Sequence, residues 1–335
     1  MAESSRRRIL LITRNLPPLV GGMERLNWHM AEELAKVAEV RVIGPKGSAA
    51  GAPSGVTIRE VALKPLWRFL WQAQRQARRE ARAWRPDVVL AGSGLTAPLA
   101  RFAARVCGAR TAVYVHGLDV ATTHPLYRAI WRPAIRAMDR IIANSRPTAE
   151  LCHTMGVDPA RIGIVHPGVD LPEPRRSDSA FRARRELGTR PLLLSVGRLS
   201  ERKGLREFVR ESLPRIVASH PDAMLLIVGD APGDALHAKA QSPASIQAAA
   251  DAAGVGPNLK FLGTITDYAQ LGEIYRPAAA HVFPVRQPAG DPDGFAMVAV
   301  EAAAPGLPTP AFATGRIRRP VAERPPGRLD AAPPS

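Results

Sequence analysis

The chain has 335 residues, of which 46% are hydrophobic, so it is long enough to bury the cores of two domains rather than one. Its only cysteines, Cys107 and Cys152, exclude a small disulfide-stabilised scaffold and a cysteine-based metal cluster, and they favour a reducing, cytosolic setting. The formal charge of +16 favours an anionic partner or, with equal weight, a solvated arginine-rich surface.

The sequence lacks the signals of two other classes of protein. No helix-turn-helix, RNA-recognition or zinc pattern accompanies the positive charge, so we expect no nucleic-acid partner. No apolar run reaches the roughly 18 to 20 residues that span a bilayer. The run Ile9 to Ile12 is too short for the core of a signal peptide and is expected to form the first strand. We therefore expect a cytoplasmic protein, either soluble or peripheral on the inner face of the membrane.

Short β-branched or leucine-rich runs alternate with helical patterns along the chain, which predicts βαβ units and mostly parallel sheets. In the first half, the predicted strands are 9–13, 40–43, 56–61, 88–91, 111–115 and 141–144. Predicted helices begin near residues 23, 66, 96, 125 and 147. The alternation stops between Val165 and Pro191, where prolines and charged residues give the composition of a linker.

A second series of the same kind follows. Its predicted strands are 192–196, 224–228, 259–262 and 281–283, and its predicted helices are 204–219, 244–253, 268–275 and 296–304. The two series predict Rossmann-like domains at residues 1–168 and 191–315, with a linker at 169–190 and an irregular tail at 316–335. Because such folds bind ligands outside the carboxyl ends of their strands, we expect the functional residues in the loops that follow the strands.

Two loops of the first domain carry candidate residues. The pair Gly21-Gly22 precedes a predicted helix, where free amides attract phosphate, although a tight turn is an equally weighted alternative. The segment from His116 to Asp119 follows an apolar strand and presents an imidazole and a carboxylate. A structural role is the more frequent one for a lone histidine, so both interpretations stay open here.

The second domain offers a cationic loop after strand 192–196. Gly197-Arg198 and Lys203-Gly204 bracket the start of a predicted helix. Two cations beside exposed amides would neutralise a diphosphate leaving group, whereas the alternative is a solvated basic loop.

A cluster of acids follows later in the second domain. Asp293 and Glu301 lie eight residues apart, where they can touch different parts of one extended ligand. Asp291 and Asp293 also match an Asp-x-Asp cation pattern. We expect no metal cofactor, because the arginine and lysine of the preceding loop already supply the positive charge.

Together these motifs resemble glycosyltransferase family 4 in their order and separations. They are Gly21-Gly22-Met23-Glu24, His116-Gly117-Leu118-Asp119, Pro167-Gly168-Val169-Asp170, Gly197-Arg198 with Lys203-Gly204, Val228-Gly229-Asp230 and the acid pair ending at Glu301. The resemblance covers roughly residues 8 to 315. It implies an α/β GT-B fold, in which two Rossmann-like domains with parallel sheets face a central cleft. It also implies retaining, metal-independent transfer of a hexose from a UDP- or GDP-sugar to a lipid-linked or saccharide acceptor in cell-envelope glycolipid or polysaccharide synthesis.

The resemblance assigns a role to each matching residue. Arg198 and Lys203 would hold the donor diphosphate and His116 would lie near the reacting carbon, which makes these three the catalytic candidates. Glu301 would bind the ribose and Asp293 the donor sugar, although the family usually has the longer glutamate at the latter position. Donor-side candidates are Gly21, Gly22, Gly197, Gly263, Thr264, Asp293, Gly294, Phe295, Ala296 and Glu301, and acceptor-side candidates are Glu24 and Asp119.

The sequence departs from the family pattern after residue 309. Prolines at 320, 325, 326, 333 and 334 cannot occupy helix interiors, so we expect the C-terminal closing helices to be missing. A frameshift or an artificial truncation is our hypothesis for the arginine- and proline-rich stretch 316–335, and it predicts reduced stability and activity. Two alternatives to the transferase follow: an inactive or regulatory GT-B remnant that binds nucleotide without transfer or, less favoured, a sugar-nucleotide epimerase or phosphorylase.

Residues 65–85 form one predicted helix that combines tryptophans with arginines. The tryptophans are at 67, 71 and 84, and the arginines at 68, 75, 78, 79, 82 and 85. This composition predicts a contact with an anionic membrane surface. An equally weighted alternative is that the tryptophans pack on the sheet beneath their own helix.

Overall fold

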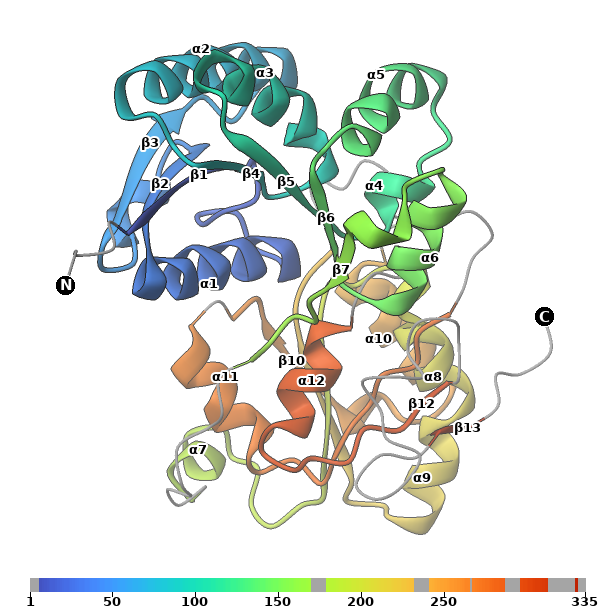
Figure 1. Ribbon diagram of the computed structural model, residues 1–335. Coiled ribbons are helices and arrows are strands. Elements are labelled where there is room, and N and C mark those ends of the chain that lie inside the picture. The colour runs from blue at the N-terminus through green and yellow to red at the C-terminus, as the bar shows by residue number, and fades with distance from the viewer. Residues whose placement is uncertain are drawn as a thin grey trace. The chain divides into compact units, whose positions relative to one another are not determined.

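The computed structural model describes residues 6–169, 179–231, 241–265, 267–286, 296–312 and 329–330. The chain divides into two compact units, Met1–Pro167 and Gly168–Ser335. Each unit is built on a parallel sheet with helices packed on its faces (Figure 1).

The sheet of the first unit has seven strands, in the order β3-β2-β1-β4-β5-β6-β7. They are β1 (Arg7–Ile12), β2 (Ala38–Pro45), β3 (Val56–Val61), β4 (Val88–Ala91), β5 (Arg110–Val115), β6 (Arg140–Ala143) and β7 (Ile162–Ile164). Alternate residues of β1 face opposite sides of the sheet, so Leu10 and Ile12 pack in one core and Leu11 in another. The strand order reverses between β1 and β4, which is where this type of sheet opens a crevice for ligands.

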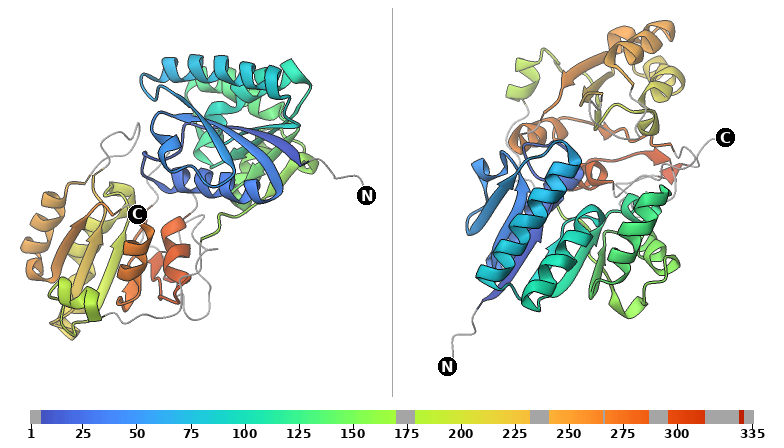
Figure 2. Two further views of the ribbon diagram at one scale, coloured as in Figure 1. Left: turned by 90° about the vertical axis from the view of Figure 1, so that its left-hand side faces the viewer. Right: turned by 90° about the horizontal axis from the view of Figure 1, so that it is seen from above.

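Helices cover both faces of this sheet. Helix α1 (Gly22–Val37) packs on one face, while α2 (Leu66–Trp84) and α3 (Ala97–Cys107) lie side by side on the other (Figures 1 and 2). The remaining helices are η1 (Ser48–Gly51), η2 (Gly94–Thr96), α4 (Leu118–Ala121), α5 (Pro125–Arg136), α6 (Arg146–Thr154) and η3 (Pro159–Arg161). Within the part of the chain that the structure describes, no helix is both long and apolar enough to cross a membrane.

The second unit has a sheet of four parallel strands in the order β10-β9-β8-β11. They are β8 (Leu192–Val196), β9 (Met224–Val228), β10 (Leu259–Gly263) and β11 (Ala280–His281). Its helices are α7 (Ser179–Arg184), η4 (Glu201–Lys203), α8 (Leu205–Glu211), α9 (Leu213–Ser219), α10 (Pro243–Ala252), η5 (Gly256–Asn258), α11 (Tyr268–Tyr275) and α12 (Met297–Ala303). The two parallel sheets confirm the predicted α/β class.

Some elements differ from the sequence prediction. The helix predicted at 204–219 is two helices, α8 and α9, because Pro214 lacks the amide that a continuous helix needs. Strand β7 was not predicted, since its three residues are too short to show a pattern. Within the predicted linker, α7 buries Phe181, and Leu187 joins the same core. Within the predicted irregular tail, β13 (Leu329–Asp330) pairs in parallel with β12 (Ala311–Phe312).

Candidate functional site

In the first unit, polar side chains gather where β1, β4 and β5 end. Gly92 follows β4, and its carbonyl oxygen accepts a hydrogen bond from Nε2 of His116 at 3.0 Å. A Cβ on Gly92 would lie 2.0 Å from Oδ1 of Asn27 and 2.7 Å from Cβ of Thr13, so only glycine allows these elements to approach so closely. His116 is 6% exposed, and because a carbonyl oxygen can only accept, this bond requires a proton on Nε2.

Asp119 joins the ends of β4 and β5. Its Oδ2 accepts hydrogen bonds from the backbone amides of Gly94 at 3.0 Å and of His116 at 3.2 Å. The hydroxyl of Tyr127 is close by, because a Cβ on Gly94 would lie 2.9 Å from its oxygen. Burial raises the pKa of Tyr127, and the charge of Asp119 raises it further, so this side chain stays a neutral phenol.

The predicted glycine pair lies at the start of α1, on the same edge of the sheet. Gly21 is the N-cap residue in extended conformation, and α1 begins at Gly22. Oε1 of Glu24, in the first turn, accepts a hydrogen bond from Nδ2 of Asn15 at 2.8 Å. These residues and His116 therefore belong to one edge of the first unit, as their positions after β1 and β5 require.

Sequence reasoning missed a group of buried polar atoms in this region. Oδ1 of Asn27, Oγ of Ser93 and the hydroxyl of Tyr127 are buried without a hydrogen-bond partner among the described residues. An unsatisfied buried group of this kind costs about 1–3 kcal/mol, so ordered water or a bound ligand is the expected partner. Asn27 carries no sequence signal, because a polar residue in an amphipathic helix is usually solvated.

In the second unit, glycines bring the loop after β8 against the neighbouring strand ends. A Cβ on Gly229, after β9, would lie 1.9 Å from the carbonyl oxygen of Gly197. Gly204 has a φ of +64°, and a Cβ there would lie 2.1 Å from the carbonyl oxygen of Pro284. The loop is therefore held backbone to backbone on both sides, which only glycine permits.

The two predicted cations of this loop border the same hollow. Arg198 is exposed, whereas Lys203 is partly buried, with Nζ 4.9 Å from the ring centre of Phe283. The hollow has a volume of about 10 Å³, roughly the space of one water molecule. It lies outside the carboxyl end of β8, so the structure brings Arg198 and Lys203 together where the sequence predicted a phosphate site.

A row of rings connects Lys203 to the second predicted donor residue. The ring of His281 stacks on Phe283 at 5.9 Å and meets Tyr275 edge-on at 6.0 Å. The hydroxyl of Tyr275 donates a hydrogen bond to Oε2 of Glu301 at 3.3 Å. Burial, with a smaller effect of the Lys203 ammonium, lowers the pKa of His281 to about 3, so the imidazole is neutral.

The other predicted donor-side residues are divided between described and undescribed parts of the chain. Gly263 and Thr264 are exposed at the carboxyl end of β10, with Gly263 at a φ of +71°. Ala296 is buried at the N-terminus of α12. Asp291, Asp293, Gly294 and Phe295 lie outside the described residues.

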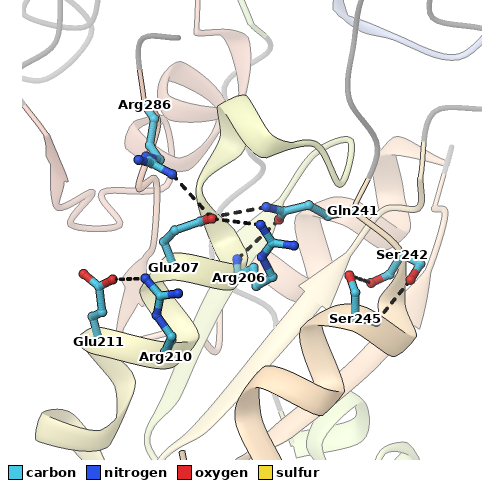
Figure 3. A network of polar contacts seen from close by, with 8 residues as sticks. All are labelled: Arg206, Glu207, Arg210, Glu211, Gln241, Ser242, Ser245 and Arg286. Atoms are coloured by element: carbon cyan, nitrogen blue, oxygen red, sulfur yellow. Dashed lines mark hydrogen bonds and ion pairs between the residues drawn. The ribbon is translucent and has the colours of Figure 1, made fainter. Parts of the chain in front are cut away.

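Glu207 on α8 is the centre of a polar network that the sequence did not reveal (Figure 3). Its carboxylate contacts Arg206 at 3.3 Å, Gln241 at 3.3 Å and Arg286 at 3.4 Å. Partial burial raises the pKa of Glu207, but hydrogen bonds from the backbone and Gln241 and the two arginine charges outweigh it, so the net shift is downward. The amide of Arg286 also donates to the carbonyl of Arg202 at 2.8 Å, so the network reaches the cationic loop.

Comparison with known proteins follows the division into two units. Residues 20–173 match the family model Glycosyltransferase Family 4, and residues 190–331 match the model Glycosyl transferases group 1. The first unit is thus a glycosyltransferase family 4 domain, and the second is a glycosyl transferase domain of group 1. D-inositol 3-phosphate glycosyltransferase of Segniliparus rotundus is 33% identical over 210 residues, which cover 61% of this chain and 44% of that protein. The chain thus spans less than half the length of this curated relative.

Solved structures share the fold of this chain. HepE of Anabaena, solved in complex with UDP-glucose, has a TM-score of 0.75 at 18% identity, covering 97% of this chain and 85% of HepE. Sucrose-phosphate synthase of Thermosynechococcus elongatus has a TM-score of 0.76 at 20% identity, covering 97% and 86%. At these identities the likeness concerns the fold, and it confirms the predicted GT-B class.

Proposed function

We propose that the protein transfers a hexose from a UDP- or GDP-sugar to a lipid-linked or saccharide acceptor, with retention of configuration and without a metal cofactor. The observation that carries this proposal is the placement of Arg198 and Lys203 around one hollow outside the carboxyl end of β8. The relatives named D-inositol 3-phosphate glycosyltransferase support glycosyl transfer, and the HepE complex with UDP-glucose supports a nucleotide-sugar donor.

The donor side of the proposal rests on charge. A nucleotide diphosphate is the leaving group, and the negative charge that develops on it is stabilised by donors that are already in place. Arg198 and Lys203 supply two cations, and the Phe283 ring beneath Nζ helps to hold the lysine. Glu301 accepts hydrogen bonds from the ribose hydroxyls, with Tyr275 orienting its carboxylate.

The carboxyl edge of the first unit supplies His116 near the reacting carbon of the sugar, and Glu24 and Asp119 on the acceptor side. His116 keeps Nδ1 available for a sugar hydroxyl, since its Nε2 is bonded to Gly92. In the proposed reaction, the acceptor oxygen bonds to the anomeric carbon as the bond from that carbon to the phosphate oxygen breaks. The acceptor proton passes to the departing phosphate oxygen, so no protein nucleophile is needed.

The setting proposed for this reaction is the cytoplasm, at the inner face of the membrane, in the synthesis of cell-envelope glycolipid or polysaccharide. A lipid-linked acceptor fits a protein whose surface combines a net charge of +16 with exposed aromatic side chains.

Charge-removing variants of the cationic loop test the proposal. R198A and K203M are each expected to weaken UDP or GDP binding about 10-fold or more, because a hydrogen bond to a charged group contributes about 1.5–3 kcal/mol. The matched control is R215A, which removes an exposed arginine from α9. Calorimetry with UDP and with uridine separates phosphate from base contacts, and the loss should appear with UDP alone.

Two results would overturn the proposal. Unchanged affinity for both diphosphates in R198A and K203M would remove the phosphate site. Retained nucleotide binding without transfer to crude lipid or saccharide acceptors, from any UDP- or GDP-sugar, would replace the transferase with a nucleotide-binding remnant.

A further inference from the structure

Helix α2 divides its tryptophans between the core and the surface. Trp84 is 9% exposed and packs with Phe69 against the sheet, whereas Trp67 and Trp71 are 70% and 57% exposed. The alternative in which the tryptophans pack on the sheet beneath their own helix therefore holds for Trp84, whereas Trp67 and Trp71 are exposed. On the neighbouring helix α3, Phe102 is also exposed, at 54%.

A hollow of about 560 Å³ lies between α2 and α3, which run side by side (Figure 2). Its lining residues are Gln74, Arg78, Phe102, Arg105 and Val106. The guanidinium of Arg105 lies 5.6 Å from the ring centre of Phe102, so an aromatic wall orients one of its cations.

The polar groups of this hollow are nearly all hydrogen-bond donors. Arg78 and Arg105 have only donors, and Nε2 of Gln74 is buried without an acceptor among the described residues. Burial lowers the pKa of Arg101, one turn before Arg105 on α3, and the charge of Arg105 lowers it further, against an opposing effect of Asp139. Two guanidiniums and an unsatisfied amide N–H are the complement of a phosphate group.

The hollow belongs to the same face of α2 as the exposed tryptophans. Trp67, Trp71, Gln74 and Arg78 follow one another at spacings of four, three and four residues, which places them along one stripe of the helix. Tryptophans that flank a phosphate site are typical of the boundary between lipid headgroups and acyl chains.

We propose that the hollow between α2 and α3 binds the phosphate of an anionic phospholipid headgroup, while Trp67 and Trp71 enter the interface of the same membrane. Arg78 and Arg105 pair with the phosphate oxygens, and Gln74 donates its buried N–H to one of them. The site is separate from the donor loop and does not depend on sugar transfer. Because α2 begins just after β3, its first turns lie at the carboxyl edge of the sheet, on the same side as His116.

Vesicle co-sedimentation of the full chain tests this site. Vesicles of phosphatidylcholine alone are compared with vesicles that contain phosphatidylglycerol in equal amount. The double substitution Arg78→Ala with Arg105→Ala is expected to weaken binding to the anionic vesicles about 25-fold, because each lost cation weakens binding about fivefold. The control pair, Arg68→Ala with Arg79→Ala, removes the same charge from α2 outside the hollow and is expected to weaken binding several-fold less.

A variant of unchanged charge separates a built site from a diffuse basic surface. Gln74→Leu is expected to weaken binding to the anionic vesicles about tenfold, because it removes the buried donor and keeps every arginine. Circular dichroism checks that each variant is folded, and the Arg78→Gln with Arg105→Gln pair replaces the alanine pair if that one unfolds.

Three results would overturn the proposal. One is equal loss of binding in the two arginine pairs, and another is unchanged binding of Gln74→Leu, since both indicate diffuse attraction. The third is calorimetric binding of soluble glycerol 3-phosphate without binding to phosphatidylglycerol vesicles, which would assign the hollow to a free phosphate compound. Neither donor binding nor transfer enters these measurements, so this inference and the proposed function fail independently.

Discussion

The hydroxyl of Tyr275 donates a hydrogen bond to Oε2 of Glu301 at 3.3 Å, which links α11 to α12 within the second unit. Tyr275 is buried and packs edge-on against His281, so its hydroxyl has a defined position. This hydrogen bond thereby orients the Glu301 carboxylate, which is proposed to bind the ribose.

Removing this hydroxyl should weaken ribose recognition selectively. Y275F is expected to lower UDP affinity about two- to tenfold, because a hydrogen bond of this kind contributes about 0.5–1.5 kcal/mol. Calorimetry with 2′,3′-dideoxy-UDP is the control, since that ligand lacks the hydroxyls that Glu301 would bind. Equal losses for both ligands would show that Tyr275 does not act through the ribose contact.

The network around Glu207 should contribute more stability than a neighbouring exposed pair. E207Q removes a carboxylate that is 17% exposed and contacts two arginines, and it is expected to destabilise the fold by about 1–2 kcal/mol. E211Q breaks the pair of Glu211 with Arg210, both about 60% exposed, and should leave the unfolding free energy nearly unchanged. Urea unfolding measures both, and equal effects would contradict the prediction.

The pH dependence of the Glu207 contribution follows from its lowered pKa. The contribution is complete above the ordinary carboxyl pKa of about 4.5 and is lost as the pH falls through the lower value of the folded state. The difference in unfolding free energy between wild type and E207Q should therefore shrink on acidification. A difference that grows instead would reverse the assigned direction of the shift.

His281 should make the second unit sensitive to acid. Its folded-state pKa is about 3, below the unfolded value of about 6.5, so the unfolded chain binds the proton first. The contribution of neutral His281 to the free energy of unfolding is fully present above about pH 6.5. It falls by at most about 1.4 kcal/mol per pH unit down to about pH 3. H281F keeps a ring between Phe283 and Tyr275 and should flatten this dependence, whereas H220A, at an exposed site, should retain it. Urea unfolding over this pH range decides, and an unchanged slope in H281F would refute the assignment.

Gly204 should be irreplaceable for steric reasons. In G204A the new Cβ would lie 2.1 Å from the carbonyl oxygen of Pro284, at a φ of +64°. We expect a loss of about 2–4 kcal/mol in unfolding free energy. G254A is the control, since Gly254 has a φ of +72° with nothing within 4 Å of a Cβ, and it should lose only about 1–2 kcal/mol. Similar losses in denaturant unfolding would mean that the contact with Pro284 relaxes freely.

Several elements could be predicted to the residue. Strands β8 and β9 have the predicted bounds, because short apolar runs between polar segments are typical of strands buried on both faces. Helix α11 also matches its prediction. Strand β7 could not be predicted, because it has only three residues and its last two are exposed. The break between α8 and α9 follows from Pro214. It was missed because the apolar spacing continues across the proline, and a proline either bends or ends a helix, depending on the packing around it.

The candidate site was accessible from sequence only in part. Gly197, Arg198 and Lys203 could be identified because a loop between a strand and a helix keeps its residues adjacent in the chain. Glu207 could not be identified, since a charged residue on a surface helix looks the same whether it is solvated or meets Gln241 and Arg286.

The order of residues along the chain was enough to predict the alternation of strands and helices, the two domains and the cationic loop. Each of these features is set by residues that are close together in the sequence. Folding alone decided that His116 bonds to Gly92, 24 residues earlier, that rings connect Lys203 with Glu301, and that Gln74 and Arg105 line one hollow. Such contacts depend on which strands the crossover connections place side by side and on which helix faces they bring together. Neither is written in the periodicity of a single segment.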